Sequence, residues 1–500
     1  MSRQAQLWLA LYFPRLPVEV WQRSVTDVTA SARASLDAVV DGPDNAPRIV
    51  ALTESAQTQG LHNGMLLSAA LAMQLQLEVR QRSLVDEHDA LISLAGWSSQ
   101  FTSMVSPVSG THAGLLLELG ASQRLFGDIG KLAIRIVDEL VGLGYSAVWA
   151  LAPTPTAAWL LARSEQCVQL YALPQVREAL GPVPMHCLEL DSRTVEALAS
   201  VGIHRLDDCW DLPRAETARR FGTALWQQLD RALGTRADPR RIYQSPERVR
   251  HVLNLLVPVQ GVEPLLFAFS RLVGQMQGVL LAGNTAAQVL DLEMVLANGK
   301  RIHLAIDLIA PSRDSQHLRV LLRHRLEQVQ LDEPVEQIAL EASQTVNLAP
   351  RNLDLFDDSL EREDEWAATL ERLRARLGRE CVHAFELMPE QRPERAWRPV
   401  SPLTERKNDA ASPVSSDNDI GIYRPLWLLA EPRSLALREG VPCYGGCLQL
   451  ETPAERIESG WWEGRDVRRD YHVASNGQGE RYWIFQDRRN RGWYLHGVFS

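Results

Sequence analysis

The sequence predicts a multidomain α+β protein with a flexible linker and a small β-rich C-terminal domain. Three observations lead to this prediction. The chain has 500 residues, which exceeds one hydrophobic core and suggests about three or four domains. Apolar strand-like runs alternate with helical stretches through much of the chain. The last part, from about residue 421, is rich in aromatic residues and strand-like.

The composition is that of an ordinary soluble protein. Hydrophobic residues make up 45% and charged residues 23% of the chain. No apolar run approaches the ~20 residues that a membrane helix needs. Six cysteines in 500 residues give no disulfide framework. We therefore expect a cytoplasmic protein that does not contact a membrane.

The pattern along the chain predicts five parts. Residues 1–170 and 241–345 mix strands with helices, and residues 171–240 are helical with short loops. Residues 346–420 form a polar linker that contains a charged helix, and residues 421–500 form the β-rich domain.

The periodicity of apolar residues places the elements of the two mixed parts. In the first, the expected strands are Leu7–Phe13, Arg48–Leu52, Gly114–Leu119 and Ala147–Leu151, and the expected helices are Leu67–Leu77, Asp86–Thr102 and Gly130–Val141. In the third, the expected strands are Val249–Leu255, Ala287–Leu296, Arg301–Leu308 and Val335–Ala342, and the expected helices are Glu263–Leu281 and Ser315–Gln328. Two helices on one face of four strands would make a small α+β module.

The linker and the last domain leave alternatives open. Residues 389–420 are rich in Pro, Ser, Asp and Asn and are expected to be disordered. The run Tyr423–Leu429 is either a partner-docking segment or the first strand of the last domain. Cys443 and Cys447 suggest a zinc site only loosely, so two buried structural cysteines are the preferred interpretation. The zinc interpretation would also use His472 and His496.

The linker contains one expected helix, Glu361–Leu377, which is charged. Its apolar residues, Trp366, Leu370, Leu373 and Leu377, lie on one side.

Charge is distributed unevenly. The whole chain carries a net charge of −10, but residues 236–325 contain 12 Arg or Lys and 7 Asp or Glu, a local net charge of +5. Residues 327–371 are strongly acidic. This asymmetry predicts one phosphate-facing domain followed by an acidic linker.

The first motif is the run Leu7–Glu19, which predicts a buried strand that leads into a helix. It resembles the strand of Y-family, UmuC-like DNA polymerases that reads roughly hhDhDxFFxxVE, with one extra residue. In that family the two aspartates hold the catalytic metals. The matching positions here are Leu9 and Leu11.

Two further motifs resemble the nucleotide-binding segments of the same family. The segment Glu54–Met65 matches YxARxxGhxxGM, whose Tyr and Arg hold the triphosphate, but those positions are Glu54 and Gln57. The segment Ala150–Ala162 matches GIAxNKxxAKxA, and Trp159 stands where the second lysine would reach the phosphates.

The acids of the reaction are therefore missing together with its cations. The stretch Val105–Gly120, which matches the second acidic motif, has no Asp or Glu before Glu118. Two-metal phosphoryl transfer needs several converging carboxylates and cations on the departing phosphates. We therefore expect no catalytic residue, metal or cofactor. The alternative is an active error-prone polymerase with displaced acids, for which Glu19, Glu118 and Asp128 are the candidates.

Two regions are predicted to contact DNA. Residues 196–212 resemble the helix–hairpin–helix of a polymerase thumb, with Gly202 and Ile203 in the hairpin, although an ordinary helical turn with a C-capping glycine is possible. Arg248, Arg250 and Arg313 lie in the part that resembles a little finger, a domain that follows phosphates without reading bases.

A short peptide follows the last DNA-facing domain. Its residues, Asn352, Leu353, Asp354, Leu355 and Phe356, resemble the bacterial clamp-binding consensus QLSLF or QLDLF, with Asn in place of Gln. A buried loop is the other interpretation, but the flanking Pro350, Asp357 and Asp358 disfavour it. The sequence therefore predicts an attachment to the sliding clamp.

The motifs together resemble the ImuB family of polymerase-like proteins, as do the stretches Glu455–Tyr471 and Gly492–Phe499. That resemblance implies a non-catalytic adaptor in damage-induced translesion synthesis and SOS mutagenesis. It implies four partners: primer–template DNA, the sliding clamp, an error-prone copy of the replicative polymerase α subunit, and a RecA-like accessory protein. A protein-only adaptor without DNA binding is the third possibility.

Overall fold

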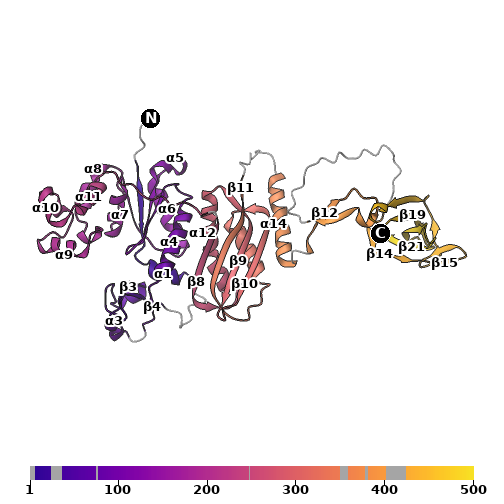
Figure 1. The fold of residues 1–500 in the computed structure, drawn as a ribbon, viewed down its shortest axis with the longest axis horizontal. Coiled ribbons are helices and arrows are strands. Elements are labelled where there is room, and N and C mark those ends of the chain that lie inside the picture. Colours follow the sequence, from indigo (N-terminus) through magenta and orange to yellow (C-terminus); the bar gives the residue numbers. More distant parts are fainter. Residues whose placement is uncertain are drawn as a thin grey trace. The chain divides into compact units, whose positions relative to one another are not determined.

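The computed structural model describes residues 6–23, 36–74, 77–246, 248–348, 359–377, 381–400, 424–464 and 466–499 (Figure 1). The chain divides into two compact units, Met1–Arg376 and Leu377–Ser500. The larger unit mixes helices with strands, and the smaller unit consists mainly of strands. The predicted α+β class with a β-rich C-terminal region is therefore confirmed.

The first sheet of the larger unit is antiparallel and has the strand order β5-β6-β1-β7. Its central strand β1 forms because a run of five apolar residues can be buried on both faces. Helices α4 and α6 cover one face, and α7 covers the other. The elements are β1 (Trp8–Tyr12), β5 (Val105–Val108), β6 (Gly114–Glu118), β7 (Val148–Ala152), α4 (Leu84–Ser98), α6 (Ile129–Gly142) and α7 (Pro155–Arg163).

A second, smaller sheet of order β3-β2-β4 follows the first helix of the chain. That helix, α1 (Leu16–Gln22), has Pro17 in its first turn, where a missing N–H costs nothing. The other elements are β2 (Ala38–Asp41), β3 (Arg48–Leu52), β4 (Val79–Gln81), α2 (Glu54–Thr58) and α3 (Leu67–Met73). The small core of this layer is formed by Ala38, Val40, Ile49, Leu52, Ala56 and Leu61, among others. The short helix α5 (Gln123–Phe126) precedes α6 and packs on the core of the first layer.

Four short helices follow α7 and share its core. They are α8 (Leu173–Leu180), α9 (Ser192–Ser200), α10 (Arg214–Phe221) and α11 (Ala224–Ala232). The predicted helical character of residues 171–240 is confirmed. Leu198, Leu225 and Leu229 from this region pack into the same core as Trp8 and Ala10 of β1.

The third sheet is antiparallel with the order β10-β9-β11-β8, and helices α12 and α13 cover one of its faces. All six elements agree with the expected ones. They are β8 (Val249–Val259), β9 (Thr285–Leu296), β10 (Arg301–Ser312), β11 (Val335–Asn347), α12 (Val262–Ala282) and α13 (Ser315–Leu326). The arrangement follows from strands whose alternate residues are apolar, because only one face of the sheet needs a helical cover.

Helix α12 lies between this sheet and α4 of the first layer (Figure 1). Among the described residues it is the one helix long and apolar enough to cross a membrane, so the expectation that no apolar run approaches that length was wrong. Of its most apolar window, 61% is buried inside the protein. Its crossing with α4 is close because Gly278 brings the backbone of α12 against Trp97. The apolar character of α12 is therefore explained by two buried sides.

Helix α14 (Ser359–Leu377) lies against the third sheet by a side that we did not expect. Its Glu371 is 3% exposed and accepts backbone N–H bonds from Ile309 and Ala310, at 2.5 and 3.1 Å. Trp366 and Leu373 of the predicted apolar side are 64% and 43% exposed. Helix α14 is therefore attached to β10 by the hydrogen bonds of the Glu371 carboxylate, while Leu373 is exposed to solvent.

The second unit is mainly β-structure. Its largest sheet has the order β14-β21-β20-β19-β17, with β18 also paired to β19. Residues 384–400, inside the expected linker, form a hairpin, so the expectation of disorder from residue 389 was wrong for residues 389–400. The elements are β12 (Ala384–Leu387), β13 (Trp397–Val400), β14 (Trp427–Ser434), β15 (Ala436–Arg438), β16 (Val441–Cys443), β17 (Gln449–Leu450), β18 (Glu455–Ser459), β19 (Val467–Ser475), β20 (Arg481–Asp487) and β21 (Trp493–Val498).

The cysteines of this unit are not buried, so the preferred interpretation of Cys443 and Cys447 was wrong. Cys447 is exposed and Cys443 is half-buried, with their Sγ atoms 3.0 Å apart. The two histidines of the zinc interpretation have other partners. His496 is buried against the Tyr471 hydroxyl at 2.7 Å, and His472 lies 3.1 Å from the carbonyl of Thr452.

The close crossing of α4 and α12 generates a stability prediction. A Cβ at Gly278 would lie 2.5 Å from Trp97 Cδ1 and 2.8 Å from the Trp97 carbonyl oxygen. We expect Gly278→Ala to lower the free energy of unfolding by about 1–3 kcal/mol, because the helices must separate. Gly142→Ala in α6, where a Cβ meets nothing within 4 Å, is the matched control and should be neutral or stabilising. Urea unfolding measures both, and equal midpoints would contradict the packing described.

Candidate functional site

Leu9 and Leu11, at the positions that resemble the metal-binding aspartates, lie on one face of the central strand. Leu9 pairs opposite Leu117 and Leu151, and Leu11 pairs opposite Leu115 and Trp149. Both leucines are fully buried in the core that α4 and α6 share with the sheet. A carboxylate at either position would lose its hydration without gaining a partner.

The other face of β1 is also filled. Trp8 and Ala10 are buried in the core beneath α7. Trp159 of α7 stands edge-to-face with Tyr12 at 5.7 Å, and it lies so close to Gly114 that an added Cβ would be 2.2 Å from its ring. Its Nε1 donates to Glu189 at 3.3 Å. The side chain at the position of the phosphate-binding lysine is therefore an aromatic core residue.

The end of β1 carries neutral groups. The Tyr12 hydroxyl lies 3.3 Å from Nδ1 of His112. Burial, followed by the nearby Arg163, lowers the pKa of His112 to about 4, and burial raises the pKa of Tyr12. At neutral pH both side chains are therefore uncharged, and neither compensates the negative charge of a triphosphate.

The three acids that could replace the missing aspartates already have protein partners. Glu118 accepts N–H bonds from Leu7 at 3.1 Å, from Gly120 at 2.9 Å and from Ala121 at 3.2 Å. Asp128 caps α6 through the Lys131 N–H at 3.1 Å. These contacts hold a loop and a helix start, which are structural roles.

Glu19 is buried, as Glu118 is, but one of its carboxylate oxygens is left without a hydrogen bond. It accepts the Ser146 N–H at 3.0 Å and the Ser146 hydroxyl, while its Oε2 has no protein partner. Burial raises the pKa of Glu19 more than Ser146 lowers it. Within the described parts of the chain, no group of three or more His, Cys, Asp or Glu side chains could hold a metal ion.

Glu54 and Gln57 lie on α2. Thr53 caps the start of this helix, because its hydroxyl accepts the Ala56 N–H at 3.2 Å. Glu54 pairs with Arg15 at 2.5 Å, and both Glu54 and Gln57 are exposed. Arg15 lies in the part of the first motif that contains the extra residue. Sequence reasoning did not identify it as a partner of Glu54. The pairing neutralises a cation that would otherwise be available to a phosphate.

The residues of the predicted helix–hairpin–helix, 196–212, form the end of α9 and the turns that follow it. Gly202 has φ +84°, which requires glycine, and Ile203 is buried. The N–H groups of Gly202 and Ile203 donate to Ala199 and Leu198 at 3.0 and 3.1 Å. These internal bonds are those of a helix C-terminus, so they fit the capping interpretation as well as the DNA-contacting one.

The next two amides of this hairpin are also satisfied inside the protein. Asp208 Oδ2 accepts the N–H groups of His204 and Arg205, both at 2.8 Å, and these bonds, with that of Arg205 first, lower the pKa of Asp208. A phosphate at these amides would have to displace the carboxylate of Asp208. The role of Gly202 and Ile203 in DNA binding stays a prediction.

The three arginines of the third sheet lie at two opposite edges. Arg248 comes just before the edge strand β8, and Arg250 is its second residue. Arg313 follows the other edge strand, β10. Arg248 is exposed, and Arg313 donates to Asn284 Oδ1 at 3.4 Å. They do not form one cluster.

Arg250 is already engaged by acids on the open face of the sheet. It pairs with Glu293 at 2.6 Å and lies 3.9 Å from Glu341, while Arg301 pairs with Glu293 at 2.7 Å. Burial acts to raise the pKa of Glu293, but the hydrogen bonds and charges of Arg250 and Arg301 outweigh it, so this pKa is lowered. Arg248 is therefore the better-exposed cation at this edge. The predicted clamp-binding peptide, Asn352 to Phe356, lies outside the described residues.

The burial of β1 generates a prediction about restoring the acids. We expect Leu9→Asp combined with Leu11→Asp to prevent folding of the larger unit, because two unpaired carboxylates in an apolar core cost several kcal/mol each. Leu125→Asp is the control, since Leu125 is 79% exposed. Circular dichroism during thermal unfolding measures the effect. A folded double variant that binds Mn²⁺ in calorimetry would contradict this view of β1.

Comparisons with known proteins agree with the sequence motifs. No family model matches the chain. Protein ImuB of Caulobacter vibrioides strain NA1000 / CB15N is 26% identical over 467 residues, which cover 88% of this chain and 100% of that protein. The same protein of strain ATCC 19089 gives the same values.

Solved structures of Y-family DNA polymerases also align with the chain. The insertion ternary complex of Dbh DNA polymerase is 14% identical, covers 69% of this chain and 100% of its own, and has a TM-score of 0.39. DinB from Sulfolobus solfataricus is 14% identical, covers 67% and 98%, and has a TM-score of 0.37. The resemblance to ImuB that the motifs predicted is thus confirmed by sequence similarity over most of the chain.

Proposed function

We propose that this protein is a non-catalytic, Y-family polymerase-like adaptor in damage-induced translesion synthesis and mutagenesis. It binds primer–template DNA, attaches to the sliding clamp, and recruits an error-prone polymerase α subunit and a RecA-like accessory protein. The observation that carries this proposal is the complete burial of Leu9 and Leu11 at the positions of the metal-holding aspartates.

The neighbouring residues support the loss of catalysis. Two-metal transfer requires carboxylates that converge on both ions and cations on the departing phosphates. Both faces of β1 are packed with apolar or aromatic side chains, and Trp159 fills the position of a phosphate-binding lysine. Glu118 and Asp128 are engaged as caps. An active polymerase would have to rearrange this core.

The proposed DNA contact rests on exposed cations and not on the hairpin amides. The local net charge of +5 over residues 236–325 attracts a phosphate backbone, and Arg248 is exposed at the edge of the third sheet. The ion pairs of Arg250 with Glu293 and Glu341 reduce its contribution. Such contacts would position the duplex without reading its sequence.

The proposed partners follow from the resemblance to ImuB and from the peptide Asn352–Phe356. That peptide would place Leu353 and the pair Leu355–Phe356 in apolar pockets of the clamp. The C-terminal unit supplies exposed apolar groups for protein partners, including Trp427, Trp461 and Trp462, which are 71%, 75% and 59% exposed. Large exposed apolar groups of this kind mark interaction surfaces.

A primer-extension experiment tests the central claim. We expect the purified full chain to shift primed DNA in a gel, with affinity that falls steeply as salt rises, and to add no nucleotide with Mg²⁺ or Mn²⁺. Arg248→Ala should weaken binding and reduce the slope of log affinity against log salt by about 1, because one phosphate contact is lost. Arg250→Ala should have a smaller effect. Templated incorporation would establish the active-polymerase alternative, and the absence of any shift would favour a protein-only adaptor.

The clamp contact has a separate test. We expect Leu355→Ala combined with Phe356→Ala to abolish capture of the chain by an immobilised sliding clamp, because both apolar anchors of the peptide are removed. Asp358→Ala, two residues beyond the peptide, is the control and should be captured like the parent chain. Undiminished capture of the double variant would refute the assignment of residues 352–356.

A further inference from the structure

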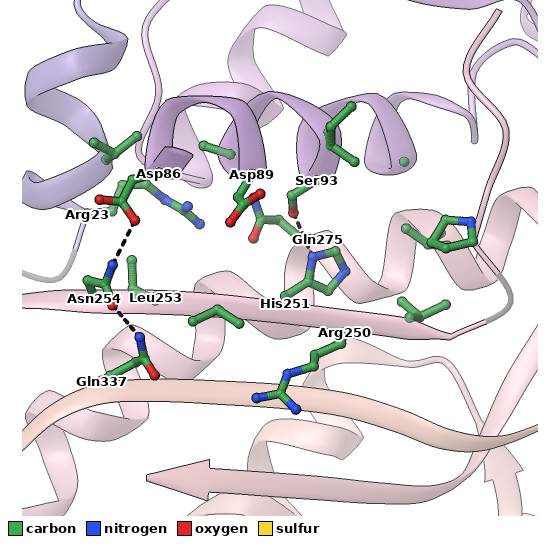
Figure 2. A pocket seen from close by; sticks show the side chains of 18 of the residues that line it. Arg23, Asp86, Asp89, Ser93, Arg250, His251, Leu253, Asn254, Gln275 and Gln337 are labelled. Carbon is green, nitrogen blue, oxygen red and sulfur yellow. Dashed lines mark hydrogen bonds between the residues drawn. The ribbon is translucent and has the colours of Figure 1, made fainter. Parts of the chain in front are cut away.

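Polar side chains outside the region of β1 gather at a cavity of about 380 Å³ between α4 and β8 (Figure 2). At this cavity Asn254 donates to Asp86 at 2.9 Å and accepts from Gln337 at 2.6 Å, so its amide is satisfied within the protein. Cys443 and Cys447 of the smaller unit are a different case, because their thiols meet each other at the surface of the protein.

The backbone places these two cysteines opposite each other. Cys443 and Cys447 form an isolated antiparallel bridge across the three-residue turn 444–446. The Leu448 N–H donates to the Pro442 carbonyl at 2.8 Å, and the first N–H of the turn donates to its last carbonyl at 2.8 Å. Because these hydrogen bonds flank the bridge, the cysteines are a non-hydrogen-bonded pair, in which Cα atoms lie about 4.5 Å apart. This spacing falls within the range of about 4.4–6.8 Å that a disulfide needs.

The turn between the cysteines depends on glycine. Gly445 and Gly446 have φ angles of +66° and +138°, and the second value lies outside the small left-handed region that other residues visit. Tyr444 packs edge-to-face on Tyr482 at 5.2 Å and attaches the turn to the core of the sheet. The folded chain therefore holds the two thiols together before any bond forms between them.

The thiols are also close enough to react and accessible to a dissolved reagent. Their Sγ atoms lie 3.0 Å apart, against about 2.05 Å in a disulfide, and a small rotation of either side chain closes this gap. Cys447 is exposed and Cys443 is half-buried. A small oxidant can therefore reach the pair without unfolding of the unit.

We propose that Cys443 and Cys447 are a reversible redox site, which a small-molecule disulfide R–S–S–R oxidises to an intramolecular disulfide. One cysteine, as its thiolate, attacks a sulfur of the reagent, forms a mixed disulfide and releases one R–S⁻. The thiolate of the other cysteine then attacks the cysteine sulfur of the mixed disulfide and releases the second R–S⁻. The two protons that the cysteines lose convert these thiolates to two R–SH, so two electrons pass from the cysteines to the reagent.

The bond would have a local structural effect. It would fasten the end of β16, in the small two-stranded sheet, to the start of β17 in the largest sheet of the unit. Leu448, the residue after Cys447, is buried in the core of that sheet. Since exposed disulfides are more easily reduced than structural ones, an excess of R–SH would reverse both steps. This site does not rest on the proposed adaptor function.

Oxidation of the full chain in glutathione buffers tests the site. Trypsin releases both cysteines in one peptide, residues 439–456, because Arg438 and Arg456 flank them. After free thiols are blocked with N-ethylmaleimide, mass spectrometry separates the reduced, mixed-disulfide and intramolecular forms of this peptide. At fixed total glutathione, we expect the intramolecular form at an oxidised-to-reduced ratio about tenfold lower than the exposed Cys167 needs to take up glutathione, because the second thiol is already nearby. A chelator is present, since paired thiols also bind soft metal ions.

A glycine variant tests the part played by the fold. Gly446→Ala keeps both thiols but makes the φ of +138° costly, so we expect half-oxidation to need an oxidant ratio about tenfold higher. Gly477→Ala is the matched control in the same unit and should oxidise like the parent chain, because Gly477 has no positive φ and a Cβ there meets nothing within 4 Å. The parent chain unfolded in urea should also need about tenfold more oxidant, since the turn is no longer held closed.

Three results would overturn the proposal. Peptide 439–456 could stay reduced while Cys167 is modified, it could carry two glutathiones, or it could oxidise equally in the native and unfolded chains. We expect an excess of reduced glutathione to restore both thiols of the native chain. A bond that resists this reduction would be a permanent structural disulfide and would contradict a reversible site. None of these measurements depends on DNA binding or on primer extension.

Discussion

The structure depends on one constraint, the burial of β1 on both of its faces. Each residue of this strand pairs with β6 on one side and β7 on the other, so its side chains can point only into the core of α4 and α6 or into the core under α7. A polymerase palm must keep one region of such a strand hydrated and acidic to hold metal ions. This chain has instead given both faces to hydrophobic packing, which contributes about 25 cal/mol for each Å² of apolar surface removed from water.

That packing accounts for the chemistry around the strand. Trp159 is buried against Gly114, so its indole N–H needs a hydrogen-bond acceptor from the protein. Glu189 supplies this acceptor. Since Glu118 ends β6 in a buried position, its carboxylate is stabilised by three backbone N–H groups of the following loop and of Leu7. The residues that look like remnants of an acidic site therefore stabilise the fold. The proposed DNA contact is compatible with this core, because the exposed Arg248 does not depend on the packing around the strand.

The sequence predicted the elements well where periodicity was strong. The four strands and two helices of the third sheet lie within a few residues of their expected bounds, because alternation and a 3.6-residue repeat are local signals. The burial of Leu9 and Leu11 followed from an unbroken apolar run. Contacts between distant residues could not be predicted. The pairing of Arg15 with Glu54, the closure of α4 on Gly278 and the bonds of Glu371 to Ile309 each join segments that no local pattern relates. The exposure of Cys443 and Cys447 was missed for the same reason, since their hairpin is short and has little covering it.

The glycine-lined crossing of α4 and α12 has a thermodynamic consequence. Because α12 is buried by its own sheet on one side and by α4 on the other, exposing either side would hydrate the apolar surface of both layers at once. We therefore expect the first and third sheets to open together and not as independent foldons. A substitution far from DNA, in the interior of α12, can thus alter the population of molecules whose β1 layer is intact.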